Sequence, residues 1–255
     1  MCSILEHRSY QFVPLGEDLF EDTKVYLQQM IQKRQEKLKE IKESVRIRKD
    51  ADTLSDKMMK MKMLAMKRLQ QFAVDVTLDP LTAHPNLVLS DDGKQVCHSD
   101  VRKNLPDNKE RFSPSVNVSG KQSFGSGRFY FEVQVKRKTK WDLGVVKESI
   151  NRKGYAPLTP KNGYWTLILR DGKLYKACED PSVILHLKCV PEKVGVFVDY
   201  EGGVVSFYDV DAAALIDSFT HCCFTHKLQP FFSPCLNDGG KNSAPLIICP
   251  VNQSE

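Results

Sequence analysis

Four side chains that commonly bind metal ions stand close together in His221-Cys-Cys-Phe-Thr-His226. Thiolate and imidazole groups are typical zinc ligands, and a structural zinc site needs four ligands in tetrahedral geometry. Successive residues of a strand point to opposite faces, however, so neighbouring ligands in this segment cannot converge on one ion. We therefore expect buried thiols and surface histidines here, and no metal site.

A glycine-rich segment, Gly239-Gly-Lys-Asn242, resembles part of a phosphate-binding loop. Such a loop needs a glycine five residues before its Gly-Lys pair and a serine or threonine after it. Cys235 and Asn242 occupy these two positions, so the match fails. The sequence also contains no Gly-x-Ser-x-Gly elbow, and no Cys/His pair stands in a recognisable catalytic setting. We predict no catalytic residue, no cofactor and no enzymatic activity for this chain.

The composition is ordinary for a globular protein: of the 255 residues, 41% are hydrophobic and 27% are charged. No apolar run approaches the roughly twenty residues that span a bilayer, and the first residues lack the apolar stretch of a signal peptide. The eight cysteines include no Cys-x-x-Cys pair, and scattered cysteines in apolar segments are typical of reduced thiols inside the cell. We predict a cytoplasmic protein without a transmembrane segment.

A long helix is predicted for residues 17–73, because this stretch lacks proline and glycine and is rich in Lys, Glu, Gln, Met and Leu. Seam residues recur at alternating steps of four and three, which is the heptad pattern of a coiled coil. The seam changes phase near residues 48–54, which indicates a stutter, a bend or a missing segment. The seam residues are Phe20, Lys24, Leu27, Ile31, Arg34, Leu38, Ile41 and Val45, followed by Leu54, Met58, Met61, Ala65, Arg68 and Phe72.

The predicted helix carries most of the positive charge. Between Lys24 and Leu69, fourteen Lys and Arg stand against six Asp and Glu, a local charge of +8 in a chain of net charge +5. The remainder of the chain is therefore slightly acidic, which argues against a globular nucleic-acid-binding surface, and we expect no DNA binding. We interpret the basic helix as a solvated charged face, with contact to an anionic membrane or to nucleic acid as the weaker alternative.

From residue 74 the pattern changes to short segments rich in β-branched and aromatic residues, separated by glycine-containing turns. Many short strands without helices between them predict a two-sheet antiparallel β-sandwich over residues 74–252. Its central hairpin is predicted at residues 194–210, where Gly202 and Gly203 can both take the positive φ that a two-residue turn requires. The predicted fold is thus mainly β, with a long α-helix before the sandwich and a short irregular lead at residues 1–16.

Six short segments of the predicted sandwich are, in order, Leu78-Asp-Pro80, Phe131-Glu-Val133, Leu143-Gly-Val145, Gly163-Tyr-Trp165, Val198-Asp-Tyr-Glu201 and Pro230-Phe-Phe-Ser-Pro234. Segments of this kind occur in the same order in the B30.2, or PRY-SPRY, domain, which residues 74–252 resemble. A PRY-SPRY domain after a heptad helix resembles the C-terminal half of a tripartite-motif (TRIM) protein, and many TRIM proteins are E3 ubiquitin ligases. Residues 237–245 are most similar to fish members of the bloodthirsty and TRIM39-like kind.

The resemblance extends to the N-terminal lead, because residues 6–14 are similar to the end of a B-box zinc finger. That finger normally carries two histidines spaced H-x-x-H, whereas here Tyr10 follows His7 and only Cys2 stands upstream. Two candidate ligands cannot hold zinc, so we predict a B-box remnant without metal. The sequence lacks the paired Cys/His spacings of a RING finger, and the helix is shorter than the family's coiled coil. We expect a truncated or alternatively spliced member that does not transfer ubiquitin alone.

The resemblance also implies a ligand-binding surface, because related PRY-SPRY domains recognise proteins with loops at one end of the sandwich. The antibody-Fc-binding member has aromatic residues at three of the corresponding places, and their absence here argues against Fc binding. Trp141 and Trp165 are candidates either for the core or for an exposed patch. The residues implied for ligand binding are Asp142, Ile168, Arg170, Leu236 and Asn237.

These observations lead to three hypotheses. In the first, a coiled-coil dimer presents PRY-SPRY domains to a protein ligand, in ubiquitination or innate immune regulation. In the second, the chain pairs through its helix with related tripartite-motif proteins and acts as a substrate-recruiting or competing subunit of a RING E3 ubiquitin ligase. In the third, the basic helix binds an anionic membrane or nucleic acid.

Overall fold

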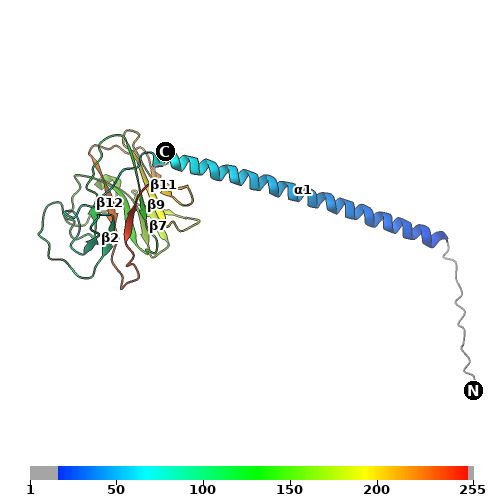
Figure 1. Cartoon of the computed structure of the whole chain (residues 1–255), viewed down its shortest axis with the longest axis horizontal. Helices are drawn as coiled ribbons and strands as arrows, with labels where there is room; N and C mark the ends of the chain where they lie inside the picture. Colours follow the sequence, from blue (N-terminus) through cyan, green and yellow to red (C-terminus); the bar gives the residue numbers. More distant parts are fainter. Residues whose placement is uncertain (1–16, 252–255) are drawn as a thin grey trace, which may run out of the picture. The chain divides into compact units, whose positions relative to one another are not determined.

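The structure, a computed structural model, describes residues 17–251 of the chain. The predicted B-box remnant, with Cys2, His7 and Tyr10, lies outside the described residues. The chain divides into two units, Met1–Met58 and Met59–Glu255, which we describe separately. Figure 1 labels the helix α1 and several of the strands, and its colours follow the sequence.

One uninterrupted helix, α1 (Glu17–Gln70), forms where the sequence lacks glycine and proline. It continues through residues 48–54, where the seam changes phase. Lys67 and Arg68 stand in its last turn, where positive charge stabilises the negative end of the helix dipole. The apolar seam side chains of residues 21–58, such as Leu27 and Leu38, are exposed in the single chain.

The rest of the described chain forms two antiparallel sheets. The first has the strand order β1-β2-β13-β4-β9-β10-β11 and the second has the order β3-β12-β5-β6-β7-β8. The first sheet consists of β1 (Leu87–Leu89), β2 (Gln95–His98), β4 (Arg128–Gln134), β9 (Lys193–Asp199), β10 (Val204–Asp209), β11 (Ala214–Phe219) and β13 (Leu246–Cys249). The second consists of β3 (Val118–Ser119), β5 (Trp141–Lys147), β6 (Tyr164–Arg170), β7 (Leu174–Ala177), β8 (Val183–Leu185) and β12 (Leu228–Ser233), with a 3₁₀ turn η1 (Pro160–Asn162) before β6.

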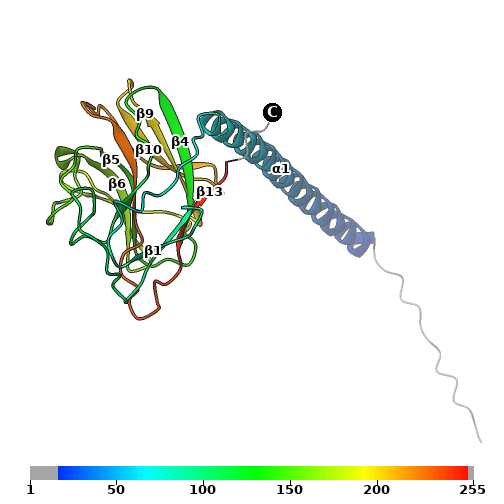
Figure 2. The ribbon, with the colours of Figure 1, turned by 60° about the vertical axis from the view of Figure 1, so that its left-hand side comes forward.

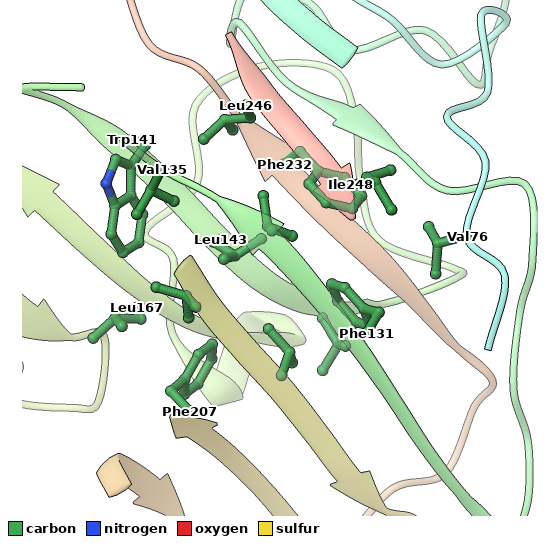
Figure 3. Packing of buried hydrophobic residues seen from close by; sticks show 14 of the residues in the cluster. Val76, Phe131, Val135, Trp141, Leu143, Leu167, Phe207, Phe232, Leu246 and Ile248 are labelled. Atoms are coloured by element: carbon green, nitrogen blue, oxygen red, sulfur yellow. The ribbon is translucent and has the colours of Figure 1, made fainter. Parts of the chain in front are cut away.

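The two sheets stand face to face and bury one continuous hydrophobic core between them (Figure 2). Inward side chains alternate with outward ones along each strand, so each strand contributes every second residue to the core. Phe131 of the first sheet lies 5.9 Å from Phe232 of the second, measured between ring centroids. Trp141 is fully buried among them (Figure 3), and Trp165 is also a core residue. The predicted mainly β sandwich after a long helix is confirmed.

The central hairpin differs from its prediction at the turn. Asp199 at the end of β9 pairs with Val204 at the start of β10, so four residues, 200–203, connect the strands. Only Gly203 has a positive φ, of 61°, and the predicted two-residue turn with both glycines left-handed is wrong. The physical reason is that the Asp199 carboxylate accepts the Gly202 N–H at 2.7 Å and thereby closes a wider turn.

The last turns of α1 belong to the same unit as the sandwich and contact the outer face of β4. The buried Glu132 carboxylate accepts hydrogen bonds from Gln70 Nε2 at 2.8 Å and from the Tyr130 hydroxyl at 3.0 Å. The same hydroxyl lies 3.6 Å from the sulfur of Met66, which is buried. Gly195 on β9 leaves room for this ring, because a Cβ there would lie 2.3 Å from the Tyr130 oxygen. Residues 66–70 are therefore packed onto the sandwich.

Candidate functional site

A cavity of about 720 Å³ opens on the outer face of the second sheet, and we call it the recognition pocket. Strands β5, β6 and β12 form its floor, while loops before β3, before η1 and after β12 form its walls. The residues that line it are Pro114, Ser115, Val116, Asn117, Lys140, Asp142, Tyr155, Ala156, Leu158, Arg170, Asp171, Leu174, Ser233, Cys235, Leu236 and Asp238.

The period of two along β5 and β6 determines which side chains reach this pocket. Trp141 points into the core, so its neighbour Asp142 points outward. On β6, Trp165 and Leu169 are core residues, and Arg170 is on the opposite face. Strands β5 and β6 pair directly, with Trp141 opposite Leu169. The alternation of inward and outward residues thus places Trp141 and Trp165 in the core and directs Asp142 and Arg170 towards the pocket.

A charge pair occupies the floor of the recognition pocket. Arg170 Nη1 donates a hydrogen bond to Asp142 Oδ1, and it also donates to the backbone oxygens of Leu169 at 2.8 Å and Trp141 at 3.1 Å. Burial raises the pKa of the Asp142 carboxyl, and the Arg170 guanidinium opposes this shift. The guanidinium is thereby held in one orientation, with part of its surface open to the pocket.

Cys235 lies beside this pair but has none of the properties of a nucleophile. Its sulfur is 3.9 Å from Asp142 Oδ1. Burial and the neighbouring Asp142 charge raise the pKa of the Cys235 thiol to about 12, so the reactive thiolate is scarce at neutral pH. The pocket therefore has a carboxylate, a guanidinium and a neutral thiol, and this set suits binding through hydrogen bonds and charge.

Part of the rim of the recognition pocket is formed by exposed apolar and aromatic side chains. The Leu236 side chain is 54% exposed and Tyr155 is 86% exposed. Lys140 and Asp238 form an ion pair of 2.7 Å at the same rim. Exposed apolar and aromatic side chains around a polar floor are the arrangement by which a pocket anchors an amphipathic segment of a partner.

Three of the five residues expected from the sequence come together in this pocket: Asp142, Arg170 and Leu236. Ile168 is half-buried opposite Asp142 on β6, outside the lining of the cavity. Asn237 is half-buried, and its side-chain amide donates to Asp100 Oδ2 at 3.1 Å. The structure thus gives Asn237 a partner beside β2, while its role in ligand binding stays a prediction.

Sequence reasoning missed Tyr155, the most exposed aromatic residue of the pocket, and the ion pair of Lys140 with Asp238. A signal for Tyr155 was present, since it stands between Gly154 and Pro157 in a turn-rich segment between two strands. An aromatic residue in such a segment is a candidate for recognition. No comparable signal exists for the ion pair, because its partners are 98 positions apart in the sequence.

Two further expectations concern metals and membranes. Among residues 17–251, no group of three or more His, Cys, Asp or Glu side chains is arranged to hold a metal ion. All residues of the segment His221–His226 lie between β11 and β12, outside regular strands, so the strand alternation expected there is wrong. The expected burial of both thiols is also wrong, because Cys222 is half-buried and Cys223 is exposed. In the described part of the chain, no helix has the length and apolar character needed to cross a membrane.

Comparisons with known proteins add to this geometry. Residues 76–124 match the family model described as the SPRY-associated domain (PRY), and residues 128–247 match the SPRY domain. Brain nuclear factor 7 of Xenopus laevis is 53% identical over 66% of this chain and 28% of its own length. The E3 ubiquitin-protein ligase TRIM69 of Rattus norvegicus is 51% identical over 68% of this chain and 34% of its own length. This chain thus spans about a third of the length of these curated relatives.

Among solved structures, the TRIM65 PSpry domain superposes with a TM-score of 0.62. The match covers 72% of this chain and 93% of that domain, at 22% sequence identity. At this identity the likeness establishes the fold alone. The two sheets described above are therefore an architecture shared with this solved structure.

Proposed function

Because the chain belongs to the B30.2/PRY-SPRY family of tripartite-motif proteins, whose PRY-SPRY domain is a protein-interaction module, we propose that its recognition pocket binds a protein ligand. The single observation that carries this proposal is the exposed apolar rim of Leu236 and Tyr155 around the Asp142–Arg170 pair. In this proposal the chain is a non-enzymatic recognition protein. The expected similarity to bloodthirsty and TRIM39-like members stays a prediction.

The ligand segment that best suits this pocket is amphipathic. An apolar side chain of the ligand packs against Leu236 and Tyr155, where burial of exposed apolar surface contributes binding energy. A hydrogen-bond acceptor of the ligand meets the Arg170 guanidinium, which Asp142 and two backbone oxygens already hold in place. Such preorganisation lowers the entropy lost on binding.

The test is affinity capture with the full chain and with two matched variants. Leu236→Asp introduces a charge at the rim of the pocket, and Leu215→Asp introduces the same change on β11, at a leucine that is 57% exposed. Both sites are exposed, so both variants should fold. We expect Leu236→Asp to lose proteins that the unmodified chain and Leu215→Asp retain. Equal capture by all three chains would contradict the proposal.

We further propose that the exposed seam of α1 joins two chains, either two copies or one copy and a related tripartite-motif protein. Leu27, Ile31 and Leu38 are apolar residues at seam spacing whose side chains are exposed in the single chain. Two linked recognition pockets would bind a multivalent ligand with higher avidity than one. A relative such as TRIM69 carries the name of an E3 ubiquitin-protein ligase. Pairing with such a relative would make this chain a substrate-recruiting or competing subunit in ubiquitination or innate immune regulation.

A further inference from the structure

A second hollow is formed by the same two chain segments that supply Lys140 and Leu236 to the recognition pocket. It has a volume of about 530 Å³, and its residues come from 134–137 at the end of β4 and from 240–245 before β13. Lys136, Arg137 and Lys241 line it, and all three residues are exposed. The described residues that line it include no Asp or Glu. We call it the basic hollow.

The positive charge of the basic hollow is only partly compensated. Lys136 forms an ion pair of 2.7 Å with Glu192. Within residues 17–251, the side chains of Arg137 and Lys241 make no hydrogen bond or ion pair. Residues 70–255 contain 22 Lys and Arg against 21 Asp and Glu, so this excess is local and does not reflect a basic domain. A local excess of cations attracts a compact anion.

The backbone at Arg137 is an independent observation that points to the same site. Arg137 has a φ of 63°, in the left-handed region where a residue with a Cβ is strained and glycine is more stable. An exposed arginine without a partner at such a position lowers stability and places a guanidinium at the hollow. Strained residues of this kind concentrate at functional sites. Across the hollow, Gly240 also has a positive φ, and a Cβ there would meet no atom within 4 Å.

Lys138 adds a further cation behind the wall of the hollow. Its side chain is buried, and its ammonium group donates hydrogen bonds to the backbone oxygens of Ala244 at 2.8 Å and Asn242 at 3.2 Å. Burial lowers the pKa of Lys138 to about 8, so the group is still mostly charged at pH 7. Because Ala244 lines the hollow, this charge is hydrogen-bonded to the wall of the hollow, whereas the three exposed cations line the hollow itself.

We propose that the basic hollow binds a single phosphate group in its dianionic form. The guanidinium of Arg137 presents planar N–H donors that match the oxygens of a phosphate. Recognition is by side chains, because the N–H groups of Gly240 and Lys241 already donate to backbone oxygens at 3.1 and 3.3 Å. The hollow is compact and the rest of residues 70–255 is nearly neutral, so the site suits a single phosphate group better than the long backbone of a nucleic acid.

The test is calorimetric titration of the full chain, at constant ionic strength, with three probes. The probes are a short phosphoserine peptide, the same peptide without phosphate, and inorganic phosphate. The test variant is the double substitution Arg137→Gln and Lys241→Gln. The matched control is Lys121→Gln and Lys188→Gln, which removes two exposed cations elsewhere and changes the net charge equally.

We expect the phosphoserine peptide to bind the unmodified chain and the control alike, and to lose at least about tenfold in affinity with the test variant, because two charge-assisted contacts are removed. Tighter binding of the peptide than of inorganic phosphate would identify a phosphorylated protein as the source, and equal affinities would identify free phosphate. The proposal is overturned if the unphosphorylated peptide binds equally, if the control loses as much affinity as the test variant, or if neither the phosphoserine peptide nor inorganic phosphate binds. Leu236→Asp, the test variant of the recognition pocket, should leave phosphate binding unchanged. A failure of the proposed protein recognition can thereby be distinguished from a failure of the proposed phosphate binding.

Discussion

The side-chain amide of Asn242 donates a hydrogen bond to the backbone oxygen of Leu236 at 3.0 Å. Asn242 is 1% exposed, and the same amide also donates to Pro234 O at 2.8 Å. Its side-chain oxygen accepts the N–H groups of Thr139 at 2.9 Å and of Lys140 at 3.2 Å. One buried side chain therefore joins the segment before β5 to the segment after β12, and both segments line the recognition pocket.

Replacing this amide by a carboxylate of the same shape should loosen both segments. Asn242→Asp loses every donor of the side chain and places a negative charge against backbone oxygens. We expect it to lower the free energy of unfolding by about 2–3 kcal/mol, since several buried hydrogen bonds are lost. Urea unfolding measures this loss. The control is Asn151→Asp, at an exposed asparagine. The side-chain oxygen of Asn151 accepts a hydrogen bond from Lys153 N, and a carboxylate keeps this acceptor. The control should therefore change the free energy of unfolding by less than about 0.5 kcal/mol.

The Glu132 carboxylate should be important for stability, because it accepts hydrogen bonds from Gln70 and Tyr130. Glu132→Ala leaves the buried Tyr130 hydroxyl without its carboxylate acceptor and creates a cavity. We expect a loss of about 2–3 kcal/mol in the free energy of unfolding. Glu148→Ala, at an exposed glutamate, is the control and should be nearly neutral. Equal unfolding midpoints for the two variants would contradict the role assigned to Glu132.

Gly203 and Gly154 separate the effect of backbone strain from that of close packing. Both have a positive φ, of 61° and 89°, so an alanine is strained at either position. A Cβ at Gly203 would also lie 2.4 Å from the Cys222 backbone oxygen, whereas one at Gly154 meets no atom within 4 Å. We expect Gly154→Ala to lower stability by about 1 kcal/mol and Gly203→Ala by clearly more. Thermal unfolding of the two variants measures the difference, and similar losses would show that Cys222 can move.

His84 should make the protein sensitive to acid. Burial lowers its pKa from 6.5 to about 4, and the nearby cations Arg102 and Arg111 and the His98 side chain act in the same direction. The unfolded chain therefore takes up this proton at a higher pH than the folded chain does. The contribution of neutral His84 to the free energy of unfolding is fully present above pH 6.5 and is lost as the pH falls towards 4. This contribution amounts to up to about 3 kcal/mol.

Unfolding by urea at pH 7, 5.5 and 4.5 measures this effect. His84 Nδ1 accepts the Asn86 N–H at 3.2 Å, and the side-chain oxygen of His84→Asn can replace this acceptor. The variant cannot take up the proton, so its free energy of unfolding should fall less between pH 7 and 4.5. A parallel decline of both proteins would exclude His84 as the acid-sensitive group.

If two chains pair through α1, charged substitutions on the seam should convert the dimer into a monomer. Ile31→Lys combined with Leu38→Lys places two charges on the seam, where burial against a second helix is unfavourable. We expect this variant to sediment as a monomer at concentrations where the unmodified chain is dimeric. Val25→Lys combined with Ile47→Lys adds the same charges at exposed apolar residues off the seam and should remain dimeric. A monomeric unmodified chain would refute the pairing of two copies.

Local patterns were sufficient to predict the elements of this protein. The absence of glycine and proline with helix-forming residues predicted α1, and short segments rich in β-branched and aromatic residues predicted the strands of the sandwich. Both predictions rest on the residue types that each backbone geometry favours. The ordered segments of the sandwich likewise predicted the family, and the comparisons confirm it.

Local patterns could not predict the hairpin turn or the composition of the pocket. The Gly202-Gly203 pair allowed a two-residue turn, but the Asp199 side chain closes a four-residue one. No period relates Tyr155 to Leu236, because the two lie on separate loops that only the folded sandwich brings to one pocket.

By itself, then, the sequence determined the long helix, the two-sheet sandwich and the family. Only the tertiary structure decided that Leu236 and Tyr155 share a rim, that Arg137 and Lys241 share the basic hollow, and that Asn242 holds the intervening segments. The physical reason is the range of the interactions. Strand and helix patterns arise between residues a few positions apart, whereas Asn242 and Thr139 are 103 positions apart and meet only when both sheets have formed.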